Sequence, residues 1–444
     1  MAPPAQRSDA PTLSDLRSPE PARALATEAL GLMRELYPLC RSITGAGLRD
    51  TLRRLAEIAP FELAEVPTGT KVLDWEIPPE WVLREAWLRG PDGELIADVR
   101  RHSLELVSYS RPFRGRLSLA ELRPHLHSDP AHPDWTPYRT SYYRDDWGFC
   151  LPERRLAALT EGLYEVVIDT ALVAGGLSYA ELVIPGSTGR EFLIYTHACH
   201  PSLCNDNLSG MVAATLLART LQAESSRLTY RVIVGPGTIG SIAWLATHRD
   251  VLPRVDHGLV IGLLGDPGPL TFKRSRDGDR PVDRIAAHAL RGFPGARAVD
   301  FSPYGYDERQ FCSPGFNLPV GRLTRTPNNE YPEYHSSADN FDLISAAALG
   351  ESLQALATVL SVADRNLRYV NQQPYGEPRL GTRGLYRAVG GQHVGDFEHA
   401  LLWVLNQSDG TRTLLDIAER AQLPFDRIWE AAAALSGVGL LRAV

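Results

Sequence analysis

The sequence predicts an α/β sandwich with a central, mostly parallel sheet, a small inserted β domain and a C-terminal winged-helix-like domain. Three observations lead to this prediction. After about residue 164, uninterrupted apolar strands alternate with amphipathic helices, which is typical of a parallel sheet covered on both faces. Before that point, short β-like runs alternate with turn signals such as "GPDG". After about residue 380, three helical patterns precede one short terminal strand.

Length, charge and cysteine content exclude several classes of protein. A chain of 444 residues is too long for one compact core and suggests two or three domains. The formal net charge of −7 argues against a general nucleic-acid binder. No apolar run approaches the roughly 20 residues that span a bilayer, and the first residues lack the apolar region of a signal peptide. The five cysteines are odd in number and scattered, so we expect a reduced, cytoplasmic protein.

Domain boundaries follow from the same patterns. Residues 1–21 are rich in Pro, Ser and Ala and are expected to form a flexible leader. Two helices separated by a Gly-containing turn then open the α/β domain, which we place at residues 22–60 and 161–370. Residues 61–160 are expected to form the inserted β domain, and residues 380–444 the winged-helix-like domain.

DNA binding is the obvious role for a winged helix. Residues 397–444, however, contain four Arg, no Lys and six Asp or Glu. A recognition helix needs positive charge around it to neutralise phosphates. The acidic balance therefore favours an interaction or packing role, and we expect no nucleic-acid partner.

The densest group of metal-capable side chains lies in "YTHACHPSLCNDNLSG", residues 195–210. His197 directly follows the apolar strand "EFLIYT", at the sheet edge where ligands of α/β folds gather. Asp206 precedes a predicted helix and can also be its N-cap. His200 and Cys199 can also be buried polar groups bonded to the backbone. Because these residues are clustered, we favour a metal site.

A second group lies in "NNEYPEYHSSADNFDLI", residues 328–344. His335 comes from a loop before a long predicted helix and can complete a Zn²⁺ shell of nitrogen and oxygen ligands. Asp339 follows and can orient a ligand, although capping of the helix is the simpler assumption.

Together these motifs resemble the zinc aminopeptidases of the co-catalytic, MH-clan type. "LYPLCRSITGAGLRDTL", "GTKVLDWEIP", "THACHPSLCNDNLSG" and "YHSSADNFD" are similar to a bacterial subfamily of aminopeptidase-like proteins, mostly labelled as domains of unknown function. In that subfamily a small β domain is inserted and a winged helix ends the chain. The resemblance covers nearly the full chain from about residue 25. It implies the three-layer aminopeptidase sandwich, and it matches His197, Asp206 and His335 to metal ligands.

Two departures from the family pattern concern the remaining ligands. The family places a Glu-Glu pair, general base and then ligand, where this chain has "VGPGTIGSIAWL" with Gly237. The next metal-binding Asp of the family should end the strand "HGLVIGLLG", where the nearest acid is Asp266 and a strict alignment gives Gly262. With too few anionic ligands for two Zn²⁺ ions, we expect one. His200 or Asp266 can complete that single site.

Hydrolysis also requires a proton acceptor, for which the motifs offer several carboxylates. Glu330 and Glu333 flank His335 in the sequence, and Asp307 and Glu308 lie in "YGYDERQF". For each of these carboxylates the alternative is that it is an ordinary, solvated surface residue without a catalytic role.

These residues favour a metal-dependent hydrolase of an amide bond, in which the metal polarises the carbonyl and activates water. The substrate would be a peptide with a free amino end or an acylated small molecule. The alternative is a degenerate peptidase fold that binds a ligand or partner without turnover, which Gly237 and the appended domains motivate. A third hypothesis, a DNA-binding regulator, is supported by the C-terminal helices alone.

The appended domains are also compatible with a homo-oligomer, and no membrane partner is expected.

The aromatic segment "YRTSYYRDDWGFC" has two interpretations. Its aromatic and Arg side chains can wall the active-site cleft and select the substrate, or they can simply pack the insert on the core. Substitution of Tyr142 or Trp147 should change substrate preference under the first hypothesis and only stability under the second.

Overall fold

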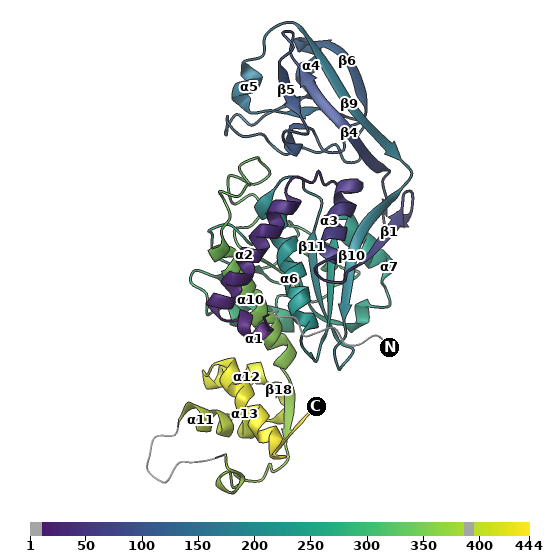
Figure 1. The fold of residues 1–444 in the computed structure, drawn as a ribbon. Coiled ribbons are helices and arrows are strands. Elements are labelled where there is room, and N and C mark those ends of the chain that lie inside the picture. The colour runs from purple at the N-terminus through teal and green to yellow at the C-terminus, as the bar shows by residue number, and fades with distance from the viewer. Residues whose placement is uncertain (1–10, 386–394) are drawn as a thin grey trace. The chain divides into compact units, whose positions relative to one another are not determined.

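A computed structural model of the chain describes residues 11–385 and 395–444 (Figure 1). The chain divides into two compact units, Met1–Ala357 and Thr358–Val444, and the division falls within the long helix α10 (Ala346–Arg365). By length and composition α10 is apolar enough to cross a membrane. However, 72% of its apolar stretch is buried inside the protein, as expected of a core helix.

An eight-stranded mixed sheet forms the centre of the first unit, in the order β1-β10-β12-β11-β13-β16-β14-β15. The strands are β1 (Glu62–Pro67), β10 (Gly176–Ile184), β11 (Glu191–His197), β12 (Thr229–Gly235), β13 (Val255–Ile261), β14 (Thr271–Lys273), β15 (Arg297–Val299) and β16 (Val320–Thr324). The central strands β12, β11, β13 and β16 run parallel, and β10 and β14 pair antiparallel on either side. The predicted parallel arrangement is confirmed at the centre of the sheet, where β11 and β12 are fully buried.

Helices cover both faces of this sheet, as the predicted sandwich requires. They are α1 (Leu13–Leu16), α2 (Pro19–Leu36), α3 (Ala46–Ala56), α6 (Gly210–Gln222), α7 (Ile239–Thr247), α8 (Pro281–Leu290) and α9 (Glu308–Phe311). α6 contacts both the sheet and α2, and it is buried on nearly every side, which its almost wholly apolar sequence allows. Figure 1 shows α7 on the opposite face from α2 and α6.

Three predicted boundaries differ in the structure. Residues 11–21, which we expected in a flexible leader, form α1 and the start of α2, because Leu13 and Leu16 are buried. Residues 1–10 of that leader lie outside the described part of the chain. The insert begins after β1 rather than at residue 61, because β1 pairs with β10 at the edge of the central sheet. It also extends past residue 160, since β9 (Leu163–Val173) belongs to its sheet.

The inserted domain is built on a four-stranded antiparallel sheet of order β5-β4-β9-β6. Its strands besides β9 are β4 (Glu80–Arg89), β5 (Leu95–Asp98) and β6 (Phe113–Ser118). The predicted turn "GPDG" joins β4 to β5, and its last residue, Gly93, has a positive φ of 83° that favours glycine. Shorter elements around this sheet are β2 (Lys71–Val72), β3 (Trp75–Glu76), α4 (Leu119–Leu122), β7 (Leu126–His127), β8 (Phe149–Cys150) and α5 (Glu153–Ala157).

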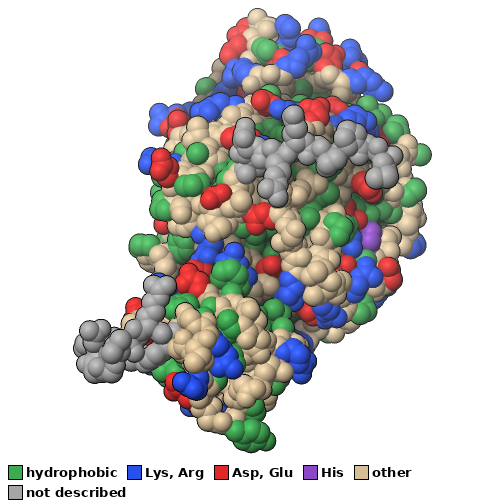
Figure 2. Space-filling view, turned by 60° about the horizontal axis from the view of Figure 1, so that its bottom comes forward, with side chains coloured by type: hydrophobic (Ala, Val, Ile, Leu, Met, Phe, Trp, Pro, Cys, Tyr) green, Lys and Arg blue, Asp and Glu red, His purple; other side chains and the backbone are tan. Residues whose placement is uncertain are grey.

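The second unit has the predicted winged-helix character. Its helices are α11 (Asp396–Gln407), α12 (Leu414–Ala421) and α13 (Phe425–Gly437). A sheet of order β18-β17-β19 accompanies them, formed by β17 (Arg368–Asn371), β18 (Asp409–Thr413) and β19 (Leu441–Ala443). The unit therefore starts before residue 380, because β17 is its middle strand. Among the described residues on the face drawn in Figure 2, basic and acidic side chains are interspersed, without a continuous basic stripe.

Candidate metal centre

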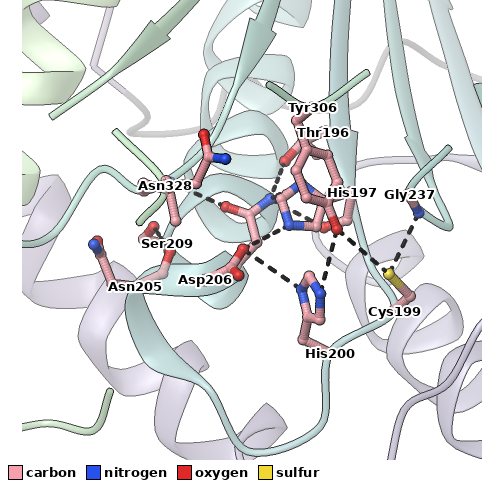
Figure 3. Close-up of polar contacts among 12 residues, drawn as sticks. Thr196, His197, Cys199, His200, Asn205, Asp206, Ser209, Gly237, Tyr306 and Asn328 are labelled. Atoms are coloured by element: carbon pink, nitrogen blue, oxygen red, sulfur yellow. Dashed lines mark hydrogen bonds and ion pairs between the residues drawn. The ribbon is translucent and has the colours of Figure 1, made fainter. Parts of the chain in front are cut away.

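Three side chains from one short segment converge beyond the end of β11. His197 is the last residue of that strand, His200 follows in the loop, and Asp206 lies in the π-helical segment η3 (Cys204–Ser209) that leads into α6. Nε2 of His197 lies 2.7 Å from Oδ1 of Asp206, and Nδ1 of His200 lies 3.5 Å from the same oxygen (Figure 3). All three side chains are at most 5% exposed, so their polar atoms depend on one another for partners.

His335 joins this cluster from the loop that precedes α10. Its Nε2 lies 3.0 Å from Oδ2 of Asp206, yet both atoms are buried without a hydrogen bond of acceptable geometry, and so is Nδ1 of His200. Buried polar atoms that lack a partner are rare and call for an explanation. Three imidazole nitrogens and one carboxylate facing one another form a donor set that suits Zn²⁺. These residues therefore fit a metal ion.

The charge states of the cluster also suit a metal. Burial lowers the pKa of His200 to about 3, so that its imidazole is neutral at pH 7. Burial acts to raise the pKa of Asp206, but the imidazoles of His200 and His197 hold that pKa well below its ordinary value. A neutral imidazole and an ionised carboxylate are the forms that bind metal ions.

The loop that carries Asp206 is held in place by Asp339. The carboxylate of Asp339 accepts the backbone N–H of Asn205 at 2.5 Å and that of Asp206 at 2.9 Å. Its backbone carbonyl accepts the N–H of Cys204 at 3.0 Å. We expected Asp339 to cap the long helix, but α10 begins only at Ala346, and the carboxylate instead supports the ligand loop.

Two glycines stand where the resemblance leads one to expect carboxylates, and neighbouring side chains fill the space beside them. A Cβ atom at Gly237 would lie 2.6 Å from the ring of Tyr306, and a Cβ at Gly262 would lie 2.7 Å from Oδ1 of Asn207. Tyr306 is itself stacked on His197, with ring centroids 3.8 Å apart (Figure 3). Side chains at these two positions would therefore displace residues that support the cluster.

Tyrosine rings surround the imidazoles, and two of them, Tyr306 and Tyr334, were not among the predicted site residues. Tyr334 stacks on His335 at 3.9 Å, and Tyr138 meets the rings of His200 and His335 edge-on at 5.2 and 5.1 Å. The hydroxyl of Tyr306 lies 3.3 Å from Nε2 of His200. Because Nε2 of His200 contacts this hydroxyl, Nδ1 is the nitrogen that faces Asp206. In metal-binding histidines, likewise, one ring nitrogen binds the metal and the other makes a hydrogen bond.

Asp266 is not brought to the cluster. Its carboxylate accepts hydrogen bonds from Nδ2 of Asn205, Oγ1 of Thr326 and the backbone N–H of Gly268. These bonds occupy both oxygens, so the residue holds loops together behind the site. His200, the other residue that we expected to complete a single site, does face Asp206.

The predicted proton acceptors lie in different surroundings. Glu330 is half-exposed and pairs with Arg297 at 2.9 Å, whereas Glu308 is buried and pairs with Lys273 at 2.6 Å. Glu333 is partly buried, two residues before His335. Glu330 is therefore a surface residue that forms an ion pair, as its alternative interpretation predicted.

Asp307 is fully buried beside the N-terminus of α7. Its Oδ1 accepts the backbone N–H of Thr238 at 2.7 Å and the hydroxyl of Ser241 at 2.6 Å, while its Oδ2 has no hydrogen-bonding partner. Burial raises the pKa of Asp307 to about 6. This carboxylate directly follows Tyr306, whose ring covers His197.

A cavity of about 480 Å³ lies on the accessible side of the cluster, lined by His335 and by residues of the insert that include Tyr138, Arg139, Tyr142 and Arg144. The side chain of His335 is 34% exposed, in contrast to the buried side chains of His197, His200 and Asp206. Trp147 is not among the lining residues; it stacks on His125 at 3.8 Å. The aromatic segment thus contributes Tyr142 to the cavity wall and Trp147 to packing inside the insert.

Arg41, in the predicted helical region before the insert, supports the cluster from behind. It is fully buried, its Nε donates to the carbonyl of His200 at 2.9 Å, and its Nη1 donates to the carbonyl of Leu36 at 2.6 Å. We expect Arg41→Met to lower the free energy of unfolding by about 2–4 kcal/mol, because two buried carbonyls lose their donors. Thermal unfolding measures this loss. Arg53→Met, which removes an exposed arginine, is the matched control and should change stability by less than about 1 kcal/mol.

Comparisons with known proteins agree with this architecture. Residues 30–366 match the family model of a domain of unknown function, DUF4910, and residues 367–443 match a winged helix-turn-helix model. A Clostridium acetobutylicum protein, described as a candidate polysaccharide biosynthesis protein with an aminopeptidase-like domain, is 43% identical over 419 residues, which are 94% of this chain and 96% of that protein.

Solved structures give the same picture of the fold. The crystal structure of a candidate peptidase from Clostridium acetobutylicum is similar with a TM-score of 0.90 and 41% identity, covering 96% of this chain and 98% of that one. The zinc aminopeptidase BSAP from Bacillus subtilis has a TM-score of 0.55 and 13% identity, covering 76% of this chain and 95% of that one. The second similarity concerns the fold alone.

Proposed function

The chain belongs to the DUF4910 family, and from this premise we propose that it is a hydrolase that cleaves an amide bond with one zinc ion. The ligands would be His197, His200, Asp206 and His335. The observation that carries the proposal is the convergence of three imidazoles on one buried carboxylate, in which Nδ1 of His200, Nε2 of His335 and Oδ2 of Asp206 lack hydrogen-bonding partners. The aminopeptidase-like fold supports hydrolysis as the reaction class.

The substrate in this proposal is a peptide with a free amino end or an acylated small molecule. The Clostridium acetobutylicum relative is named for polysaccharide biosynthesis, which favours the acylated small molecule. Zinc, when bound, would supply Lewis-acid polarisation of the scissile carbonyl and activation of a water molecule.

The residues of the chain itself have separate tasks in this reaction. His197, His200 and Asp206 are buried and hold the site, whereas His335 is the ligand that the cavity exposes. The substrate amide would therefore approach past His335. Tyr138 lies against His335 and lines the cavity, so it restricts the space for water around the reacting bond.

A single ion fits this chain better than the two ions of co-catalytic aminopeptidases. A second ion needs further carboxylates to offset its charge. Tyr306 and Asn207 fill the space beside Gly237 and Gly262, where those carboxylates would stand. We therefore propose one zinc ion per chain.

Asp307 is the proton acceptor that we favour, because its buried Oδ2 has no hydrogen-bonding partner and lies in the residue next to Tyr306, which covers His197; Glu333 is its competitor. Because burial raises the pKa of Asp307 to about 6, kcat/KM should fall as the pH is lowered through about 6, where the carboxylate gains its proton. Asp307→Asn should lower kcat by about 100-fold or more and abolish this acid limb, with zinc content unchanged. A pH profile of each variant checks this.

The controls separate the two candidates. Glu330→Gln, which removes only a half-exposed ion pair with Arg297, should leave the rate and its pH profile unchanged. If Asp307→Asn keeps the acid limb and full activity while Glu333→Gln loses them, Glu333 is the acceptor and the assignment of Asp307 is wrong.

The hydrolase itself is tested with a set of aminoacyl and N-acyl amides. Turnover that a chelator removes and Zn²⁺ restores supports it, provided that His197→Ala lacks this turnover. Turnover and metal content that survive in both His197→Ala and His335→Ala would exclude it.

A second candidate function has its own support. The filled positions beside Gly237 and Gly262 also suit a peptidase fold that has kept a binding site and lost catalysis. Such a protein would bind an amide ligand, with or without metal, and would never turn it over. Chelator-sensitive turnover rules this candidate out.

A further inference from the structure

Two arginines lie in the wall of the cavity, and the charge of one of them, Arg139, acts on Asp129, which is not among the lining residues. Arg139 and Arg144 both line the cavity beside His335, and both are exposed. Within the described part of the chain, neither guanidinium has an ion pair or a hydrogen bond. Nearby arginines of the insert differ, since Arg111 pairs with Asp145 at 2.6 Å. The cavity therefore presents two guanidinium groups that are free to bind a ligand.

The other titratable groups of the cavity leave it positively charged. Asp146 is the acid among the lining residues, and its Oδ1 already accepts the backbone N–H of Trp147 at 2.8 Å and lies 3.6 Å from Nδ1 of His125. His127 also lines the cavity, and burial lowers its pKa, which favours the neutral imidazole. Two arginines thus face one carboxylate that is engaged with its own neighbours.

The cavity is held at a fixed place relative to the metal-binding cluster. Tyr138 donates its backbone N–H to the carbonyl of His335 at 2.7 Å. Thr136 and Ser337 exchange two further hydrogen bonds, each of 2.9 Å, between the same two segments. A ligand held by the residue next to Tyr138 would therefore lie close to the exposed edge of His335.

We propose that Arg139 and Arg144 bind an anionic group of the substrate, a carboxylate or a phosphate, next to the amide that reacts at the metal centre. Guanidinium groups recognise both anions through paired hydrogen bonds. The position of the reacting amide rests on the proposed function, but binding of the anion does not. The substrates of this site are thus anionic amides rather than neutral ones.

The test compares anionic probes with neutral partners by isothermal titration calorimetry on the zinc-loaded full chain. N-acetylglycine is compared with N-acetylglycinamide for the carboxylate, and N-acetylglucosamine 6-phosphate with N-acetylglucosamine for the phosphate. The probe with the recognised anion should bind about tenfold tighter or more than its neutral partner. Arg139→Met/Arg144→Met should erase this difference, because methionine keeps an apolar stem and removes the charge.

Two controls make the result specific. Arg116→Met, an exposed arginine of the same insert that does not line the cavity, should bind as the unaltered chain does. Because anions can also bind a metal ion directly, the titration is repeated with Asp206→Asn, in which the metal ligands are disrupted. If Asp206→Asn still prefers the anionic probe and only Arg139→Met/Arg144→Met loses that preference, the anion binds in the cavity and not to the metal. This result would stand even if no amide is hydrolysed.

Each outcome decides the proposal. Preference for the carboxylate probe or for the phosphate probe supports it and identifies the anion. Equal binding of anionic and neutral probes overturns it, and so does a preference that the double arginine variant retains. The thermal unfolding midpoint of that variant should match that of the unaltered chain, because both side chains are exposed and neither guanidinium forms a hydrogen bond or ion pair with the residues that the structure describes.

Discussion

Asp206→Asn is expected to abolish both metal binding and hydrolysis. Asp206 is the carboxylate that His197, His200 and His335 all face, so the change replaces the charged member of the donor set with a neutral amide of the same shape. Loss of this ligand should weaken zinc binding by more than about 100-fold, and the rate should fall by about 1,000-fold or more. Elemental analysis and an amide-hydrolysis assay measure the two effects.

The matched control is Asp266→Asn. Asp266 is also a buried aspartate, in the loop after β13, but its hydrogen bonds go to Asn205, Thr326 and Gly268. This variant should lose some stability and keep its zinc. The same metal content in Asp206→Asn as in the unaltered chain would contradict the ligand set proposed here.

Asp339→Ala should have the second largest effect, on both stability and metal binding. The carboxylate of Asp339 accepts the backbone N–H groups of Asn205 and Asp206, and the substitution leaves these two buried donors without an acceptor. We expect the free energy of unfolding to fall by about 3 kcal/mol or more, and zinc affinity to fall by about 10- to 100-fold.

Chemical denaturation and a zinc titration measure these losses separately. Asp342→Ala is the control, because this aspartate lies in the same loop and its side chain has no hydrogen bond or ion pair in the described part of the chain. Asp342→Ala should change neither quantity. If Asp339→Ala binds zinc as tightly as the unaltered chain, the loop that carries Asp206 needs no support from Asp339.

The places of His197, Asp206 and His335 in the fold could be predicted where sequence and topology agree. His197 ends an apolar strand, and the carboxyl ends of the parallel strands β11 and β13 meet at one edge of the sheet. Asp206 lies in the short segment η3 that leads into α6, and His335 comes from the loop before α10. Strand ends and helix starts are the parts of a chain whose place in an α/β fold follows from its pattern.

The direction of a side chain within a loop could not be predicted in the same way. His200 and Asp266 were equal candidates for the last ligand, because both follow strands that end at this edge. Their side chains point in different directions in the structure, since Asp266 is turned towards Asn205 and Thr326, whereas His200 faces Asp206. Arg139 and Arg144 lie in the aromatic segment whose side chains can wall the cleft, but only the structure shows that neither guanidinium has an ion pair with the described residues.

The filled space beside Gly237 depends on a residue that is distant in sequence. Tyr306 comes from the loop before α9 and occupies the space that a side chain at position 237 would enter. The boundary of the insert was wrong for a comparable reason. β9 shows the apolar pattern of a strand, but the choice between two sheets depends on its partners β4 and β6, which a single sequence does not reveal.

Zinc content per chain is the measurement that tests the central claim most directly. The protein is purified without chelators and analysed for metals, beside His197→Ala. We predict one zinc ion per chain and its loss in His197→Ala. A zinc content near zero that does not rise when Zn²⁺ is added would contradict the proposed centre and leave a fold that binds its ligands without metal chemistry.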